Sequence, residues 1–115
     1  MKQSRAVKYN KSKLGLISRT FYGQLKRSKS RGHKPPMYTR DELFDWCSKQ
    51  QLFHELYALW VLSGYELKMR PTIDRKKDSL GYSFTNIQLM SFSQNVSKPN
   101  LGQFKNGHTP YNLKT

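Results

Sequence analysis

The chain has 115 residues, with 21 Lys or Arg against 7 Asp or Glu, so its formal net charge is +14 and its pI is about 10.1. A charge this high predicts a polyanionic partner. The single cysteine, Cys47, excludes a disulfide framework or a cysteine-built zinc site within one chain. No apolar run is long enough for a signal peptide or a membrane span, so we expect a cytoplasmic protein with one modest core.

Residues 1–34 form a basic N-terminal arm without Asp or Glu. Apolar residues recur every three or four positions and predict an amphipathic helix from about Lys13 to Ser28. Its apolar side would pack on the body and its basic side would face nucleic acid; a helix lying on a membrane surface is the alternative interpretation. The arm residues expected to contact DNA are Lys11, Lys13, Arg19, Lys26, Arg27, Lys29 and Arg31.

Residues 35–115 complete the predicted domain. Residues 32–36 form a loop that Pro35-Pro36 keeps extended. Thr39 and Glu42 have the spacing of a capping box, which predicts a helix running to about Lys49.

A second helix is predicted from about Leu52, because apolar residues follow on a broad face until Ser63-Gly64 ends it. Aromatic residues at helical spacing are more often core than a surface on which bases stack. We therefore interpret five of them as packing residues: Phe44, Trp46, Phe53, Tyr57 and Trp60.

The sequence pattern of residues 70–98 predicts a strand, a loop, a second strand and a short helix. The β-branched run at residues 71–73 and the apolar run at residues 87–90 give the two strands. The polar stretch between them, residues 76–82, contains Gly81 at a position suited to a turn.

Ser91 and Gln94 offer another capping box, for a helix that reaches about Lys98. Folding the helix back on the strands would bring Asp74 beside the helix face that carries Asn95. Two oxygen ligands would then converge, as suits a hard cation such as Mg²⁺.

This segment resembles the ββα-metal motif of HNH (His-Me finger) endonucleases, particularly phage-type members whose motif reads approximately P-S-I-D-R-I-D-x-x-x-G-Y-x-x-x-N-I-x-x-M-T-x-x-E-N. The upstream region from Leu14 to Tyr65 also resembles these proteins. The resemblance implies an α+β fold, with N-terminal helices followed by a C-terminal ββα-metal unit at about residues 70–98. The matching positions are Pro71, Ile73, Asp74, Arg75, Gly81, Tyr82, Asn86, Ile87, Met90 and Asn95.

The resemblance also implies roles. Asp74 and Asn95 would be the ligands of Mg²⁺ or Mn²⁺, and Asn86 would brace the loop and orient the first motif. Arg75 stands where the best-studied members have a histidine as general base. Arginine is effectively always protonated and cannot take a proton. We expect Arg75 to bind the scissile phosphate or to stabilise charge in the transition state.

Three histidines are alternative bases: His33, His54 and His108. For each of them a structural interpretation is preferred. His54 would be a half-buried helix residue, and the other two would be solvated loop residues.

The function predicted for the chain is that of a phage-type, metal-dependent DNA endonuclease or nickase, acting in the host cytoplasm if it is phage-encoded. Two alternatives stay open: a non-catalytic DNA-binding protein that retains the fold, and a phage accessory protein that binds a host protein. The further residues expected to contact DNA are Arg70, Arg75, Lys76, Lys77 and Lys98.

Overall fold

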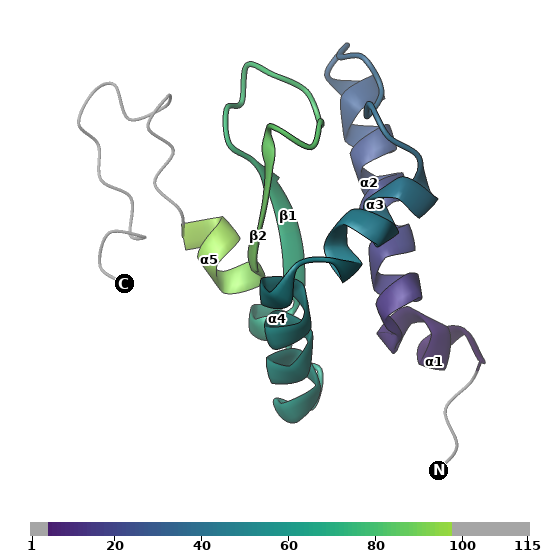
Figure 1. Ribbon diagram of the computed structural model, residues 1–115, viewed down its shortest axis with the longest axis vertical. Coiled ribbons are helices and arrows are strands. Elements are labelled where there is room, and N and C mark those ends of the chain that lie inside the picture. Colours follow the sequence, from purple (N-terminus) through teal and green to yellow (C-terminus); the bar gives the residue numbers. More distant parts are fainter. Residues whose placement is uncertain (1–4, 98–115) are drawn as a thin grey trace.

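The computed structural model describes residues 5–97. The elements in order are α1 (Arg5–Lys11), α2 (Lys13–Ser30), α3 (Arg40–Ser48), α4 (Gln51–Leu62), the 3-10 turn η1 (Leu67–Met69), β1 (Pro71–Arg75), β2 (Ile87–Ser91) and α5 (Phe92–Ser97) (Figure 1). The α+β class is confirmed, as a mostly helical chain with one two-stranded antiparallel sheet. That β1, β2 and α5 form a ββα-metal unit stays a prediction. Lys98 and His108 lie outside the described residues, among which no helix is long and apolar enough to cross a membrane.

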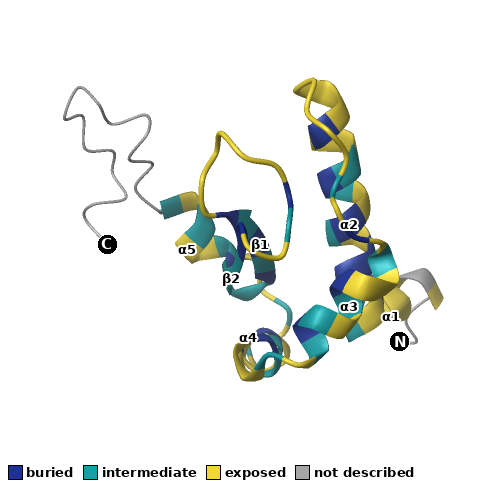
Figure 2. Cartoon of the chain, turned by 45° about the horizontal axis from the view of Figure 1, so that its top comes forward, coloured by how far each residue is buried: buried dark blue, intermediate teal, exposed yellow. Residues whose placement is uncertain are grey.

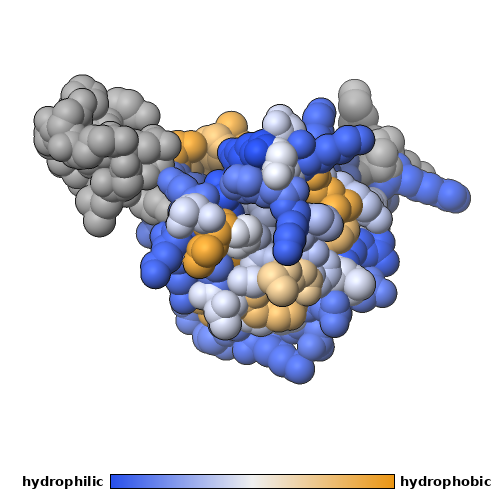
Figure 3. Space-filling model, turned by 90° about the horizontal axis from the view of Figure 1, so that it is seen from above, coloured by the Kyte–Doolittle hydropathy of each residue, from blue (hydrophilic) through white to orange (hydrophobic). Residues whose placement is uncertain are grey.

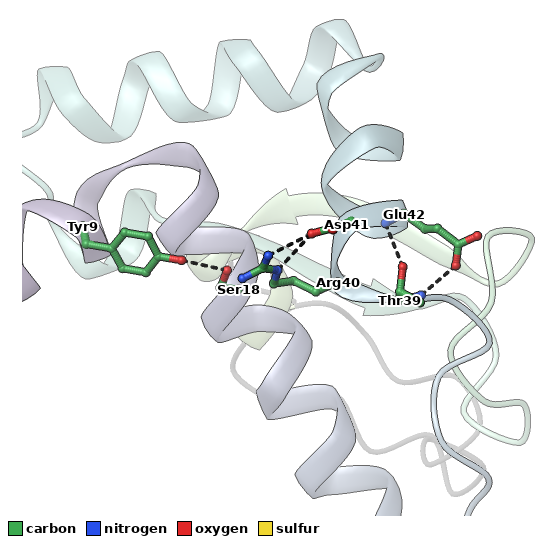
Figure 4. A network of polar contacts seen from close by, with 6 residues as sticks. All are labelled: Tyr9, Ser18, Thr39, Arg40, Asp41 and Glu42. Atoms are coloured by element: carbon green, nitrogen blue, oxygen red, sulfur yellow. Dashed lines mark hydrogen bonds and ion pairs between the residues drawn. The ribbon is translucent and has the colours of Figure 1, made fainter.

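Helix α1 is not among the elements predicted from the sequence. Ser12 separates it from α2 and caps α2, because the Ser12 side chain accepts a hydrogen bond from the backbone N–H of Gly15 at 3.0 Å. A Cβ atom on Gly15 would lie 1.8 Å from the carbonyl oxygen of Tyr9, so only glycine allows the two helices this close. The hydroxyl of Tyr9 also contacts that of Ser18 at 3.1 Å (Figure 4).

The predicted capping box at the start of α3 is confirmed (Figure 4). Glu42 donates its backbone N–H to Thr39 Oγ1 at 3.1 Å, and Thr39 donates its own to Glu42 Oε1 at 2.8 Å. An N-cap of this kind is worth about 1 kcal/mol. The start of α3 is therefore set by local sequence.

The core lies where α2, α3 and α4 meet the buried face of the hairpin. Helix α3 packs against α2, and α4 packs against α3 and both strands. Phe53 and Trp60 are buried there, as predicted, and Phe44, Trp46 and Tyr57 pack against the core while partly exposed. Burial raises the pKa of the Cys47 thiol to about 12, consistent with an inert packing role.

The hairpin pairs Pro71 with Ser91 and Arg75 with Ile87 at its two ends. Helix α5 packs on both strands. Figure 1 shows α2 along one edge of the molecule with the hairpin beside it, and Figure 2 shows that most of the loop joining β1 to β2 is exposed.

The capping box predicted at Ser91 is present. Ser91 donates its backbone N–H to Gln94 Oε1 at 2.9 Å, and Gln94 donates its own to Ser91 Oγ at 3.1 Å. This cap turns the chain from β2 directly into α5, which places the residues of α5 next to the sheet.

Candidate nucleic-acid interface and metal site

A cleft of about 620 Å³ lies between α2 on one side and β1 with α5 on the other. Arginine is its most frequent lining residue. The lining residues are Leu16, Arg19, Thr20, Arg27, Arg31, Arg70, Pro71, Thr72, Ile73, Asp74, Arg75, Asp78, Tyr82, Phe92 and Asn95.

The two predicted metal ligands, Asp74 and Asn95, line this same cleft. Successive residues of a strand point to opposite faces, and Thr72 and Asp74 are the two half-buried residues of β1 between buried neighbours. Asn95 Nδ2 donates a hydrogen bond to Thr72 Oγ1 at 3.2 Å, so the amide of Asn95 lies against the strand face that carries Asp74.

Asn86 braces the hairpin loop, in agreement with its predicted role. Its Oδ1 accepts the backbone N–H of Lys77 at 3.0 Å, while its Nδ2 contacts the carbonyls of Lys77, Leu80 and Gly81 at 3.1, 3.3 and 2.9 Å. The residue is 4% exposed and is not part of the cleft lining. Its side chain therefore fixes the loop that follows Asp74 and is buried.

The guanidinium of Arg75, which was expected to bind a phosphate, is bonded to the hairpin loop. Its Nη1 donates to the carbonyl oxygens of Asp78 and Leu80 at 2.9 and 3.1 Å, and its Cζ is 5.4 Å from the centre of the Tyr82 ring. Strand alternation puts Arg75 on the buried side with Ile73, and only 9% of it is exposed. In this conformation Arg75 holds the hairpin loop, and its phosphate role stays a prediction.

Arg19 and Arg27 on α2, and Arg31 at its C-cap, lie on one side of the helix, because they follow one another at spacings of eight and four residues. Arg27 Nε donates to the hydroxyl of Tyr82 at 3.2 Å, which links α2 to the hairpin loop. A Cβ atom on Gly23 would lie 3.2 Å from Arg27 Nη1, so the guanidinium of Arg27 rests on the bare helix backbone at that glycine.

Arg70 faces Arg19 in the cleft. Its Cζ lies 5.3 Å from the centre of the Phe92 ring. Partial burial, and then the nearby charge of Arg19, lower the pKa of Arg70 from its usual value. An arginine stays protonated despite such a shift, so two positive charges are held close together.

Within residues 5–97, none of Arg19, Arg27, Arg31 and Arg70 forms a salt bridge to a carboxylate. These four guanidinium groups therefore lie in the cleft without a carboxylate of the described residues bound to them. Guanidinium binds phosphate and carboxylate oxygens through paired N–H donors, so an oxyanion is the expected ligand.

Lys11 at the end of α1 and Lys13 at the start of α2, both predicted to contact DNA, lie against α4 and the residues after it. Lys11 Nζ is 4.4 Å from the centre of the Tyr65 ring. Lys13 Nζ lies 2.9 Å from His54 Nδ1 and 5.2 Å from the centre of the Tyr57 ring. Neither lysine lines the cleft.

His54 also lies outside the cleft. Its Nε2 is 2.8 Å from the carbonyl oxygen of Ser48 and must donate to it, which leaves Nδ1 to accept from Lys13. His54 is half-buried on helix α4, as predicted. His33 is exposed in the loop after α2, as predicted.

The other predicted DNA contacts, Lys26, Lys29, Lys76 and Lys77, are exposed but do not line the cleft. Seen from the end that carries the interhelical and hairpin loops, the surface is mainly hydrophilic, with separate small apolar patches (Figure 3). These lysines could add to long-range attraction of a polyanion without belonging to a defined site.

The oxygen atoms that the cleft residues can offer as ligands determine which metal ion would fit there. Over residues 5–97, no group of three or more His, Cys, Asp or Glu is placed to hold a metal ion. Asp74 and Asn95 offer one carboxylate and one amide oxygen, and Asp78 is a further acidic residue in the lining of the same cleft. This set does not resemble a zinc site, but it fits Mg²⁺ or Mn²⁺, which take few protein oxygens and keep water and substrate oxygens.

Sequence reasoning missed Thr72, Asp78 and the approach of Arg19 to Arg70. Thr72 could have been found, because a residue two positions before Asp74 on a strand shares its face. Comparisons with protein-family models, curated proteins and solved structures find no match to this chain. The resemblance to HNH endonucleases therefore rests on the residues quoted above.

Proposed function

We propose that the protein is a metal-dependent nuclease that hydrolyses phosphodiester bonds of DNA. The observation that carries this proposal is the position of Asp74 and Asn95 in one cleft with Arg19 and Arg70. Oxygen ligands for a hard cation and positive groups for a phosphate are the two requirements of metal-assisted phosphodiester hydrolysis.

Arg70 and Arg19 bind the scissile phosphate in this proposal. Two guanidinium groups that repel each other gain more from an anion placed between them than two separated ones do. Arg70 is also held against the Phe92 ring, so little freedom is lost when it binds. These two residues take over the role expected of Arg75, whose guanidinium is bound to loop carbonyls.

Arg27 and Arg31 extend the phosphate contacts along α2. A helix rises 1.5 Å per residue, so the row from Arg19 to Arg31 spans about 18 Å. This length corresponds to about five nucleotides along one strand of a duplex. We expect one DNA strand to follow α2 while its scissile phosphate lies beside β1.

Asp74 and Asn95 would hold Mg²⁺ or Mn²⁺. Such an ion, when bound, polarises the phosphate oxygen and stabilises the leaving oxygen. The general base is assigned to Asp78, since it is the second carboxylate of the cleft and no histidine lines that space. Asn86 and Arg75 act indirectly, by fixing the loop that carries Asp78.

A non-catalytic DNA-binding protein is the second candidate. Its supporting observation is Arg75, which occupies the usual position of the base and is engaged in holding the loop. The arginine row would bind phosphates equally well without a metal ion.

Cleavage of supercoiled plasmid in Mg²⁺, in Mn²⁺ and in EDTA separates the two candidates. Wild type should nick in either metal and not in EDTA. Asp74→Ala should abolish nicking, and Asp78→Asn should slow it by about a hundredfold or more without weakening DNA binding. Asp45→Ala is the matched control, because Asp45 lies on α3 outside the cleft. This variant should cleave plasmid at the wild-type rate. A wild type that binds plasmid but leaves it intact in both metals would establish the DNA-binding candidate instead.

A further inference from the structure

The hydroxyl of Thr72 has two partners, and their chemistry determines the direction of both hydrogen bonds. Thr72 Oγ1 lies 2.8 Å from the carbonyl oxygen of Met90, its partner across the sheet. A carbonyl can only accept, so the single hydroxyl proton of Thr72 is donated to Met90. Thr72 Oγ1 is then left as an acceptor for Asn95 Nδ2, at 3.2 Å.

This bond fixes the orientation of the Asn95 amide. An asparagine side chain can present either its NH₂ group or its oxygen to a ligand. With Nδ2 held on Thr72, the oxygen occupies the opposite edge, and no donor within residues 5–97 is hydrogen-bonded to it. Asn95 lines the cleft, so Oδ1 is the polar atom it has left for a ligand there. Only this oxygen, and not the NH₂ group, can coordinate a hard cation.

We propose that Thr72 is a positioning residue that sets the Asn95 oxygen toward the metal ion. This inference rests on the proposed metal-dependent nuclease function. Thr72 lies two residues before Asp74 on β1, so one strand would supply both a metal ligand and the group that orients the other ligand. Partners that orient metal ligands typically contribute 10- to 100-fold to metal affinity.

The first test measures Mn²⁺ affinity by electron paramagnetic resonance, with and without DNA. Thr72→Val keeps the side-chain shape but removes the hydroxyl, and it should weaken Mn²⁺ binding about 10- to 100-fold. Thr72→Ser keeps the hydroxyl and should bind as wild type does. Thermal unfolding of each variant checks that the fold is retained.

The same substitution is then tested in the Asn95→Asp variant. A carboxylate can present either of its two oxygens to the metal ion, so it does not need Thr72 to orient it. In that background, Thr72→Val should change Mn²⁺ affinity by about threefold or less, as for two sites that no longer interact. An equal loss in both backgrounds would overturn the positioning role and indicate a general effect on the strand.

NMR of the Asn95 side-chain amide provides a readout that needs neither metal nor the valine variant. In metal-free wild type and in Thr72→Ser, one Nδ2 proton should exchange with solvent more slowly than those of freely exposed asparagines. Signals like those of exposed asparagines would overturn the proposal. If wild type binds no Mn²⁺, the proposed function and the inference both fall; if it binds Mn²⁺ and Thr72→Val binds as well, only the inference falls.

Discussion

Two groups of basic residues near the N-terminus both add to the net charge but have different surroundings. Lys11 and Lys13 contact aromatic rings and His54, on the α4 side. Arg19, Arg27 and Arg31 line the cleft, and Arg19 is close enough to Arg70 to lower its pKa. Total charge therefore predicts the class of ligand, whereas the local partners of each charge predict where the ligand binds.

The largest expected difference between the two groups concerns cleavage. Arg70→Ala removes a guanidinium that would bind the scissile phosphate in the proposed function, and it should lower the plasmid nicking rate about a hundredfold or more. Lys13→Ala should leave the rate within about twofold of wild type, since removing a distant interaction affects catalysis little. Single-turnover rates at saturating DNA measure both. Equal losses in the two variants would show that the cleft is not the reaction site.

DNA affinity should show the next largest difference. Each phosphate contact adds about 0.9 to the slope of log affinity against log salt concentration. Changing Arg19, Arg27 and Arg31 together to Gln should therefore lower the slope by about 2.7. Changing Lys11 and Lys13 to Gln should alter it little. Fluorescence anisotropy of a labelled duplex over a salt series gives both slopes, and a larger change for the lysine pair would reverse the comparison.

Folding stability should show the smallest difference between the two groups. Here the lysine substitution should have the larger effect and the arginine substitution the smaller one. Lys11→Gln removes a cation–π contact and should lower the free energy of unfolding by about 0.5–1 kcal/mol. Arg19→Gln removes repulsion against Arg70 and should leave stability equal or slightly higher. Urea unfolding at low salt measures both. A clear loss of stability in Arg19→Gln would mean that this arginine has a structural role.

The parts of the fold that could be predicted from the sequence depend on local signals. The capping boxes at Thr39 and Ser91 are signals only four residues long that mark the start of a helix, and both are present. Helix α1 could not be predicted in this way, because its Tyr9 packs against Gly15 of the neighbouring helix α2, and this contact is not a local signal.

The candidate site divides similarly. Asp74 and Asn95 were expected to converge, because a strand, a turn and a helix can bring together only a few positions, and both line the cleft. The bonds of Arg75 could not be read from the sequence, since they depend on the direction of two loop carbonyls. The approach of Arg19 to Arg70 depends on how α2 packs relative to the hairpin, which no local pattern encodes.

Tyr82 connects the two walls of the cleft. Its hydroxyl accepts from Arg27 on α2, and its backbone carbonyl accepts the N–H of Met37 in the loop after α2, at 3.0 Å. If Arg27 turns its Nε–H group to a phosphate, it loses the bond to Tyr82, at a cost of about 1 kcal/mol. Phosphate binding through Nε is then linked to release of one bond between the two walls, whereas binding through the Nη groups keeps the walls joined.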